Sequence, residues 1–209
     1  MNRPILAVLL LSGGLAGLAP AEDGFTTLFD GKSLDGWTVG GPAASVSVEN
    51  GTIKTNGEPA HLFYAGPVKN HDFKDFELKL EVMTKAGSNS GVYFHTEFQE
   101  KGWPAKGFEA QVNNTFEKDP RKTGSLYAVK DVTAAPVKDD EWWEYDILVK
   151  GNAVTLKVNG KTTVEWTQPE GFDVEKQPGR KIGRGTFALQ AHDKDSTVYF
   201  RNIRVKPLD

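Results

Sequence analysis

The stretch WWEYDILVKGNAVTLKVNGK at residues 142–161 decides the fold class. Its apolar residues recur at every second position, first over 143–149 and again over 154–158. This spacing is typical of half-buried antiparallel strands. Gly151-Asn152 separates the two runs, and Asn159-Gly160 is a strong hairpin signal that leads into a further run over 161–166. The stretch therefore predicts three consecutive antiparallel strands.

The same alternation dominates the rest of the chain. In DFELKLEV at 75–82, aromatic and aliphatic residues alternate with Glu and Lys. Further strands are expected near 25–29, 45–49, 51–55, 61–65, 91–98, 107–113, 125–130, 185–192 and 197–206. No long stretch has a helical period, and at most a short turn is expected in 168–176. Roughly a dozen short strands predict an all-β fold, an antiparallel two-sheet sandwich of the jelly-roll kind.

The first 21 residues, MNRPILAVLLLSGGLAGLAPA, have the features of a secretory signal peptide. Arg3 supplies the positive start, Ile5 to Ala19 is an apolar run, and Ala19-Pro20-Ala21 fits a small-residue cleavage site. The alternative is an uncleaved membrane anchor, but the run is short and broken by glycines. We expect cleavage near Ala21, a periplasmic or secreted protein, and a single β-sandwich domain over 22–209.

Composition and missing motifs exclude several classes. The chain has no Cys, so its fold depends on a core and not on disulfides. The net charge is -3 with no basic stripe, so nucleic acid is not an expected partner, and no second apolar span would insert the mature chain into a membrane. There is no Gly-x-Ser-x-Gly elbow, phosphate-binding glycine loop or helical His pair. The segment 144–149 lacks the last acid of a two-carboxylate glucanase strand.

Three expected strands alternate a core face with a polar face. The polar faces carry Tyr93 and His95 in SNSGVYFHTEF (88–98), Glu109 and Gln111 in GFEAQVNN (107–114), and Gln190 and His192 in FALQAHD (187–193). In GSLYAV (124–129), Tyr127 shares its face with Ser125 and Val129. If these strands are neighbours in one curved sheet, their polar faces form a single concave wall.

Such a wall suits a carbohydrate, because aromatic rings stack on pyranose rings while carboxylates and amides bind hydroxyl groups. Tyr93, Tyr127 and Trp103 are the candidate stacking platforms. Each residue also has a plainer interpretation. A Glu on a strand is usually solvated, a His is more often structural than catalytic, and a Tyr such as Tyr93 is often a packing residue. The combination, more than any one member, favours a ligand-binding wall.

Several motifs together carry a family resemblance. They are GFTTLFDGKSLDGW (24–37), DFELKLEV (75–82), NSGVYFHTE (89–97), GFEAQV (107–112), TGSLYAV (123–129), the hairpin at 142–161 and FALQAHDKDSTVYFRNIRVKPL (187–208). With this set, in this order, nearly all of the mature chain resembles the 3-keto-disaccharide hydrolase family, whose domains have a concanavalin-like lectin/glucanase sandwich. Two positions depart from the family pattern. His95 stands where many members carry Arg, and Asn113-Asn114 stands where members often carry an Asp.

The resemblance implies action on glycosides whose sugar has been oxidised to a ketone at carbon 3. The ketone acidifies the proton on carbon 2, a base removes this proton, the enolate expels the group on carbon 1, and water adds later. The reaction needs a base, and a cation, divalent metal ion or hydrogen-bond donor near the enolate oxygen. The hypothesis therefore includes two alternatives, a divalent metal ion or no cofactor, and it assigns no metal ligand.

The resemblance and the alternation together give a set of candidate residues. The candidate acids and bases are Glu109, His192 and His95, and the candidate substrate-binding residues are Tyr93, Gln111, Tyr127, Gln190, Trp103 and Arg201. Arg201 has an equal interpretation as a structural anchor in the last strand. The alternative function is a non-catalytic, lectin-like carbohydrate-binding module, because sandwiches of this kind host both activities.

Overall fold

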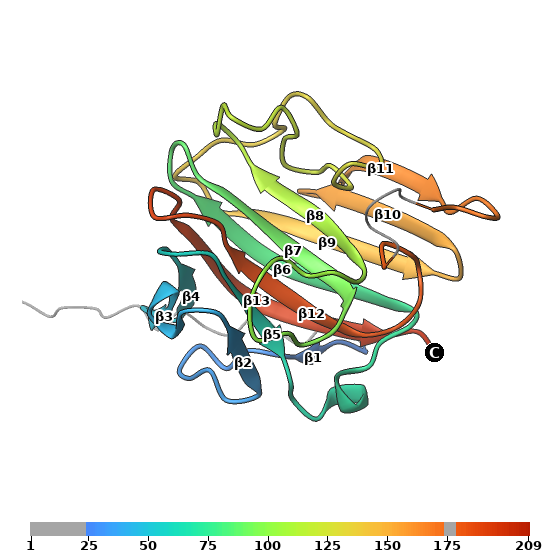
Figure 1. The fold of residues 1–209 in the computed structure, drawn as a ribbon, viewed down its shortest axis with the longest axis horizontal. Coiled ribbons are helices and arrows are strands. Elements are labelled where there is room, and N and C mark those ends of the chain that lie inside the picture. The colour runs from blue at the N-terminus through green and yellow to red at the C-terminus, as the bar shows by residue number, and fades with distance from the viewer. Residues whose placement is uncertain (1–23, 174–178) are drawn as a thin grey trace, which may run out of the picture.

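The computed structural model describes residues 24–173 and 179–209, so the expected signal peptide and its cleavage site near Ala21 lie outside the described residues. The fold has two antiparallel sheets that lie one in front of the other in Figure 1. Across the described ranges, helix is confined to two short 3₁₀ turns, η1 (Ala43–Ser45) and η2 (Val68–His71). The prediction of an all-β, two-sheet antiparallel sandwich is confirmed.

The larger sheet has eight strands, with the order β11-β10-β9-β6-β13-β4-β3 and β1 paired to β13. Its strands are β1 (Thr26–Thr27), β3 (Val46–Glu49), β4 (Thr52–Thr55), β6 (Phe76–Thr84), β9 (Trp143–Lys150), β10 (Ala153–Val158), β11 (Lys161–Thr167) and β13 (Val198–Pro207). The two predicted hairpins join β9 to β10 and β10 to β11. Asn159 has a φ of 49° and Gly160 a φ of 74°, the left-handed pair that a type I′ turn requires.

The smaller sheet has five strands in the order β2-β5-β12-β7-β8. Its strands are β2 (Trp37–Gly40), β5 (Ala60–Tyr64), β7 (Asn89–Thr96), β8 (Phe108–Asn113) and β12 (Thr186–Ala191). The three strands with predicted polar faces are therefore neighbours, with β7 between β12 and β8. Tyr93 pairs with Glu109 on β8 and with Ala188 on β12, which places their side chains on one face of the sheet.

The two sheets differ in how their outer faces are covered. In β6 of the larger sheet, buried residues alternate with half-buried ones, because Phe76 and its alternate neighbours face the core while Glu77, Lys79 and Glu81 face outward. In β5, β7, β8 and β12, every residue is buried. The loop 97–107 crosses this sheet in front of β5 and β12 in Figure 1. Polar side chains on the outer face of the smaller sheet are therefore shielded from water.

Two elements differ from the sequence-based expectation. The short strand β2 was not anticipated from the sequence. The segment 125–130 was expected to be a strand but is not one. The segment runs beside β8 and is joined to it by isolated hydrogen bonds, such as the one from Tyr127 N to Glu109 O at 2.9 Å. It then forms a turn in which Val129 N and Lys130 N both donate to Leu126 O. Ala128 has a φ of 54°, which breaks the extended conformation.

The alternation predicted for 91–98 also fails near its end. His95 has a φ of 55°, and the register between β7 and β12 shifts between Thr186 and Ala188. A left-handed residue with a register shift is a β-bulge, and it reverses the face that each following side chain occupies. Phe98, which strict alternation would place on the core face, is consequently 49% exposed.

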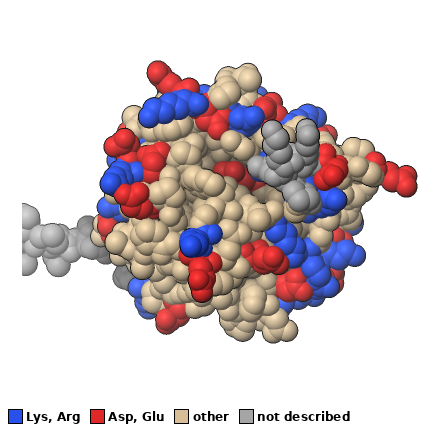
Figure 2. Space-filling model, in the orientation of Figure 1, with Lys and Arg blue, Asp and Glu red and all other residues tan. Residues whose placement is uncertain are grey.

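Most charged side chains on the surface toward the viewer lie around its edge, and a few basic and acidic ones lie near its middle (Figure 2). No basic stripe crosses the part of the surface that this view shows. Within the described ranges, no helix is both long enough and apolar enough to span a bilayer.

Candidate active site

The polar faces of β7, β8 and β12 meet at a cavity of about 330 Å³. The cavity is lined by Asn89, Tyr93, Trp103, Pro104, Glu109, Gln111, Asp119, Tyr127, Arg180, Gln190 and His192. Seven of the nine residues singled out from the sequence are in this set: Tyr93, Trp103, Glu109, Gln111, Tyr127, Gln190 and His192. Strand alternation thus brings Tyr93, the carboxylate and the two amides to one place, while Trp103, Tyr127 and His192 reach the cavity from segments outside the strands.

Glu109 is at the centre of a chain of hydrogen bonds on the sheet. The phenol of Tyr93 donates to Glu109 Oε2 at 2.8 Å, and Gln190 Nε2 donates to the Tyr93 oxygen at 2.9 Å and to Glu109 Oε1 at 3.4 Å. The side-chain amide of Gln111 also lies beside this carboxylate. In the amide orientation that gives its oxygen and nitrogen suitable partners, the nitrogen donates to Glu109 Oε1 at 3.2 Å. These donors fix the carboxylate within the cavity wall.

Burial raises the pKa of Glu109 from 4.5 to about 7, although the hydrogen bond from Tyr93 and the nearby charge of Arg180 act to lower it. Desolvation dominates because the side chain is only 6% exposed, and the charged form of a buried carboxyl is disfavoured. A carboxyl with a pKa near 7 both takes and releases a proton near neutral pH. Glu109 is therefore suited to general base or general acid work.

Gly91 makes room for this carboxylate. It pairs with Gln111 across β7 and β8, and a Cβ atom built on it would overlap Glu109 Oε1 and lie 2.7 Å from Glu109 Cγ. Its φ does not lie in the left-handed region, so the requirement for glycine here is one of space. The glycine of the NSG segment at 89–91, which lies within β7, therefore makes space for Glu109.

His192 follows β12 and reaches the opposite part of the cavity. Its Nδ1 is 2.6 Å from Asp193 Oδ2, and its ring centroid is 5.4 Å from that of Trp103 and 5.5 Å from that of Phe116. When the imidazole is neutral, a carboxylate at Nδ1 favours the tautomer with a proton there, which leaves Nε2 as an acceptor. His192 is therefore held between two rings with one nitrogen available for a ligand.

A cationic group completes the cavity on its loop side, and it was not found from the sequence. Arg180 is 8% exposed, donates from Nη1 to Tyr127 O at 2.6 Å, and lies with its Cζ 5.5 Å from the Tyr127 ring centroid. Desolvation lowers the pKa of Arg180, while the charge of Glu109 raises it. The residue comes from an irregular loop, so no periodicity pointed to it. Asp119, another lining residue, also lies in a loop and was missed for the same reason.

His61 was also missed, although the alternation of AHLFY (60–64) contains the signal. It lies on β5 beside Gln190, with ring centroids 5.2 Å from Tyr93 and 5.5 Å from Trp103. Burial lowers its pKa to about 4, and the charge of His192 acts in the same direction, so the imidazole is neutral at neutral pH. Two buried atoms, His61 Nε2 and Gln190 Oε1, have no hydrogen-bond partner within the described residues.

The structure does not bring His95 into this cavity, so the prediction that His95 shares the wall is wrong. The bulge turns its ring toward Phe76 and Phe94, with centroids at 5.6 and 5.7 Å. Its Nε2 is 2.8 Å from Lys74 O, and its Nδ1 accepts a hydrogen bond from Gly183 N at 3.2 Å. Both nitrogens of the buried ring therefore have backbone partners, which gives His95 a structural role.

Arg201 also lies elsewhere. It belongs to β13 of the larger sheet, pairs with Glu81 at 2.7 Å and places its Cζ 3.9 Å above the Trp142 ring. Of the two interpretations left open by the sequence, the structure favours the anchor. Within the residues that the structure describes, no group of three or more His, Asp or Glu side chains is placed to hold a metal ion.

Comparison with known proteins connects this geometry to a family. A model of the 3-keto-alpha-glucoside-1,2-lyase-like domain matches residues 24–206. The chain belongs to this family. A similar protein of Bacteroides thetaiotaomicron, named 3-keto-disaccharide hydrolase, is 29% identical over 90% of this chain and 79% of its own length.

Solved structures agree with this family membership. A candidate glycosyl hydrolase of Parabacteroides distasonis has a TM-score of 0.75 and 27% identity, over 89% of this chain and 94% of its own. The carbohydrate-binding module CBM66 of Bacillus subtilis has a TM-score of 0.55 at 12% identity, over 82% of this chain and 95% of its own. At that identity, the second likeness concerns the sandwich fold alone. The family, together with the names of the Bacteroides thetaiotaomicron and Parabacteroides distasonis relatives, indicates a 3-keto-disaccharide hydrolase-like glycosyl hydrolase.

Proposed function

We propose that this protein cleaves glycosides whose sugar carries a ketone at carbon 3, by base-promoted elimination in the cavity around Glu109. The observation that carries the proposal is the environment of Glu109. This carboxyl is buried, its pKa is about 7, and it accepts a hydrogen bond from Tyr93. It lines a cavity that also contains the cation of Arg180 and the imidazole of His192. The name of the Bacteroides thetaiotaomicron relative supports a substrate of the same class.

The first step is removal of the proton on carbon 2. In the deprotonated state, Glu109 takes this proton, and the electrons of the C–H bond form an enolate with the carbon 3 ketone. A base with a pKa near the working pH combines an adequate ionised fraction with adequate basicity. Tyr93 and Gln190 orient the carboxylate because both donate toward it.

The second step breaks the bond between carbon 1 and the glycosidic oxygen. The enolate electrons re-form the ketone, a double bond forms between carbons 1 and 2, and the leaving oxygen gains a proton. With its ring protonated at both nitrogens, His192 is the candidate donor of that proton, because its Nε2 is free of the Asp193 contact. Arg180, which is 8% exposed, supplies positive charge from a largely buried position, where charge stabilisation is stronger than in water. Later addition of water to the unsaturated product makes the net reaction a hydrolysis.

The test is kinetic. Glu109→Gln keeps the size and hydrogen-bonding capacity of the side chain but removes the base, so turnover of a 3-keto-disaccharide should fall by about 10²–10⁴-fold. His192→Asn should also reduce turnover, most for substrates with poor leaving groups. Glu165→Gln, at an exposed position on β11, is the matched control and should retain full activity.

The outcomes distinguish a 3-keto-glycoside-cleaving enzyme from a sugar-binding module. Turnover of the oxidised disaccharide but not of its unoxidised parent supports the 3-keto assignment, and repeating the assay with chelator tests a divalent metal requirement. Full activity in both variants would contradict the proposed site. Sugar binding without any turnover would instead favour the lectin-like module.

The proposal includes export. The sequence features of residues 1–21 support cleavage near Ala21 and action in the periplasm or outside the cell. Mass spectrometry of the protein from its native host should find a mature chain that begins at Glu22. An intact Met1 terminus would contradict this part of the proposal.

A further inference from the structure

A second and larger cavity, of about 520 Å³, opens beside the Glu109 site. We call it the Phe98 pocket; it is lined by Thr38, Phe63, Tyr64, Ala65, Asn70, His71, Asp72, Thr96, Glu97, Phe98, Lys106, Arg184, Gly185 and Thr186. Nothing in the proposed mechanism uses these residues. We propose that the Phe98 pocket is an accessory binding site for a neutral sugar ring.

The two cavities share one wall. Phe63, which lines the Phe98 pocket, packs with Tyr93 and Ala188 in a small apolar cluster, and Tyr93 lines the Glu109 cavity. The loop 97–107 also reaches both, because Phe98 faces the Phe98 pocket and Trp103 lines the Glu109 cavity. Gln99 braces this loop through hydrogen bonds with Trp103 O at 2.8 Å and Ala105 N at 3.0 Å. A saccharide held in the Phe98 pocket therefore lies next to the proposed reaction site.

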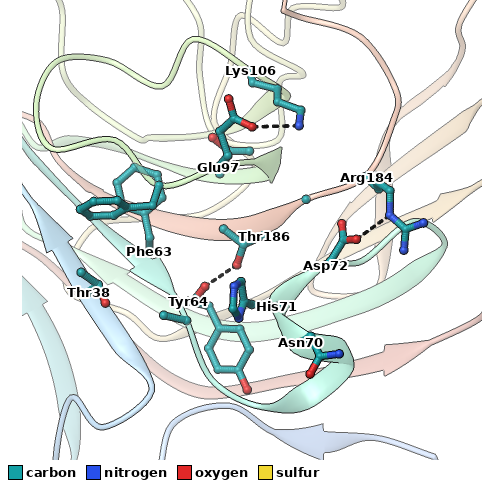
Figure 3. Close-up of a pocket in the computed structure, with 14 residues that line it drawn as sticks. Thr38, Phe63, Tyr64, Asn70, His71, Asp72, Glu97, Lys106, Arg184 and Thr186 are labelled. Carbon is teal, nitrogen blue, oxygen red and sulfur yellow. Dashed lines mark hydrogen bonds and ion pairs between the residues drawn. The ribbon is translucent and has the colours of Figure 1, made fainter.

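An exposed aromatic platform supports a sugar ligand. Phe98 is 49% exposed, yet its ring is held edge-to-face against Phe63 with the centroids 5.5 Å apart. A large apolar ring at the surface, fixed in place by a buried one, offers a flat face to a pyranose ring at little cost in side-chain entropy. Figure 3 shows Phe63 on one side of the cavity and Arg184 with Asp72 on the other, with Thr186 between them.

The charges of the pocket select a neutral ligand. Arg184 Nε pairs with Asp72 Oδ2 at 2.6 Å, and Lys106 pairs with Glu97 at 3.1 Å (Figure 3). Each cation is matched by a carboxylate, so the lining carries no excess charge from these four residues. Both pairs are partly exposed, and the Arg184 pair leaves the Nη atoms outside the contact. The pairs therefore offer donors and acceptors to hydroxyl groups without favouring an anion.

A buried hydroxyl points to a missing partner. Thr96 lines the pocket and is 1% exposed, but its Oγ1 has no hydrogen-bond partner within the described ranges. A buried polar atom without a partner is costly, and a ligand hydroxyl would remove that cost once the Thr96 side chain turns toward it. The bulge at His95 places Thr96 there, because it reverses the faces of the residues that follow.

This inference requires binding only, so it can be tested apart from turnover. The protein to use is the mature chain with Glu109→Gln, and the probes are glucose, galactose, mannose, maltose and sucrose, with glucuronate as the anionic comparison. Saturable shifts of the backbone amide resonances of Thr96, Phe98 and Arg184 are expected with at least one neutral sugar. Phe98→Ala should raise the Kd for that sugar about tenfold. A tenfold change corresponds to roughly 1.4 kcal/mol, which is the size expected for a lost aromatic contact.

Two controls decide the interpretation. Leu208→Ala removes another exposed apolar side chain, which is 40% exposed, and should leave binding unchanged. Trp103→Ala should weaken binding in the Glu109 cavity but not the shifts of Thr96 and Arg184. The inference is overturned if no neutral sugar of the panel shifts these resonances, if Phe98→Ala binds as the parent does, or if glucuronate binds more tightly. Absence of turnover of 3-keto-disaccharides would contradict the proposed function but not this inference, which is tested by binding alone.

Discussion

Glu109 should make the folded protein less stable at alkaline pH, and Glu109→Gln should remove this effect. The pKa of the carboxyl is raised from 4.5 to about 7 because folding buries it. The folded state therefore binds the proton more tightly than the unfolded state does. Below pH 4.5 the carboxyl is protonated in both states, and this extra stability is fully present. As the pH rises through 7 the folded protein must also ionise the buried group, and the stability is lost.

The size of the effect follows from the pKa difference. The difference is about 7 minus 4.5, or 2.5 units, and each unit corresponds to about 1.36 kcal/mol, which gives an upper value of about 3 kcal/mol. The glutamine side chain of the variant does not titrate. The free energy of unfolding of the variant, minus that of the parent, should therefore rise by up to about 3 kcal/mol between pH 4 and pH 8. For a domain of this size, that corresponds to about 6–12 °C in Tm.

The assay is urea unfolding of both proteins at a series of pH values, followed by tryptophan fluorescence. Titrations of all other groups cancel in the difference, provided that they are unaffected by the substitution. Glu165→Gln, at an exposed position, is the matched control. A flat difference for Glu109→Gln, or one that falls as the pH rises, would refute the reasoning. In that case Glu109 would not be a base with a raised pKa.

Three further outcomes follow from the same geometry. Tyr93→Phe removes a donor that lowers the pKa of Glu109, so the acidic limb of the pH–rate profile should move to higher pH; an unmoved limb would contradict Glu109 as the base. Gly91→Ala should displace the Glu109 carboxylate, reducing kcat/KM at least about tenfold and stability by about 1–3 kcal/mol; wild-type kinetics in a folded variant would count against that placement. Arg201→Ala should lose its contact with Trp142, lower stability by up to about 1 kcal/mol and leave turnover unchanged, as steady-state kinetics will check; a large loss of turnover would return Arg201 to the site.

Alternation located most of the wall but not its exceptions. Tyr93, Glu109 and Gln190 could be assigned to one face because period two fixes the faces of a regular strand. The same rule failed at His95, because a bulge is set by how β7 meets β12 and not by the local sequence. Arg180 could not be found at all, since its position depends on an irregular loop folding back over Tyr127.

The sequence by itself determined the sandwich, its hairpins and the residue types of the wall, because strand periodicity and Asn-Gly turns act over a few neighbouring residues. The tertiary structure alone decided which of these groups has unusual chemistry. The pKa of Glu109 is set by burial and by Tyr93, Arg180 and Gln190, which reach it from other segments of the chain. Desolvation depends on everything packed around a group. From the sequence alone, Glu109 cannot be distinguished from a solvated strand residue. It becomes a candidate base only when the folded sheet and its covering loops bury it.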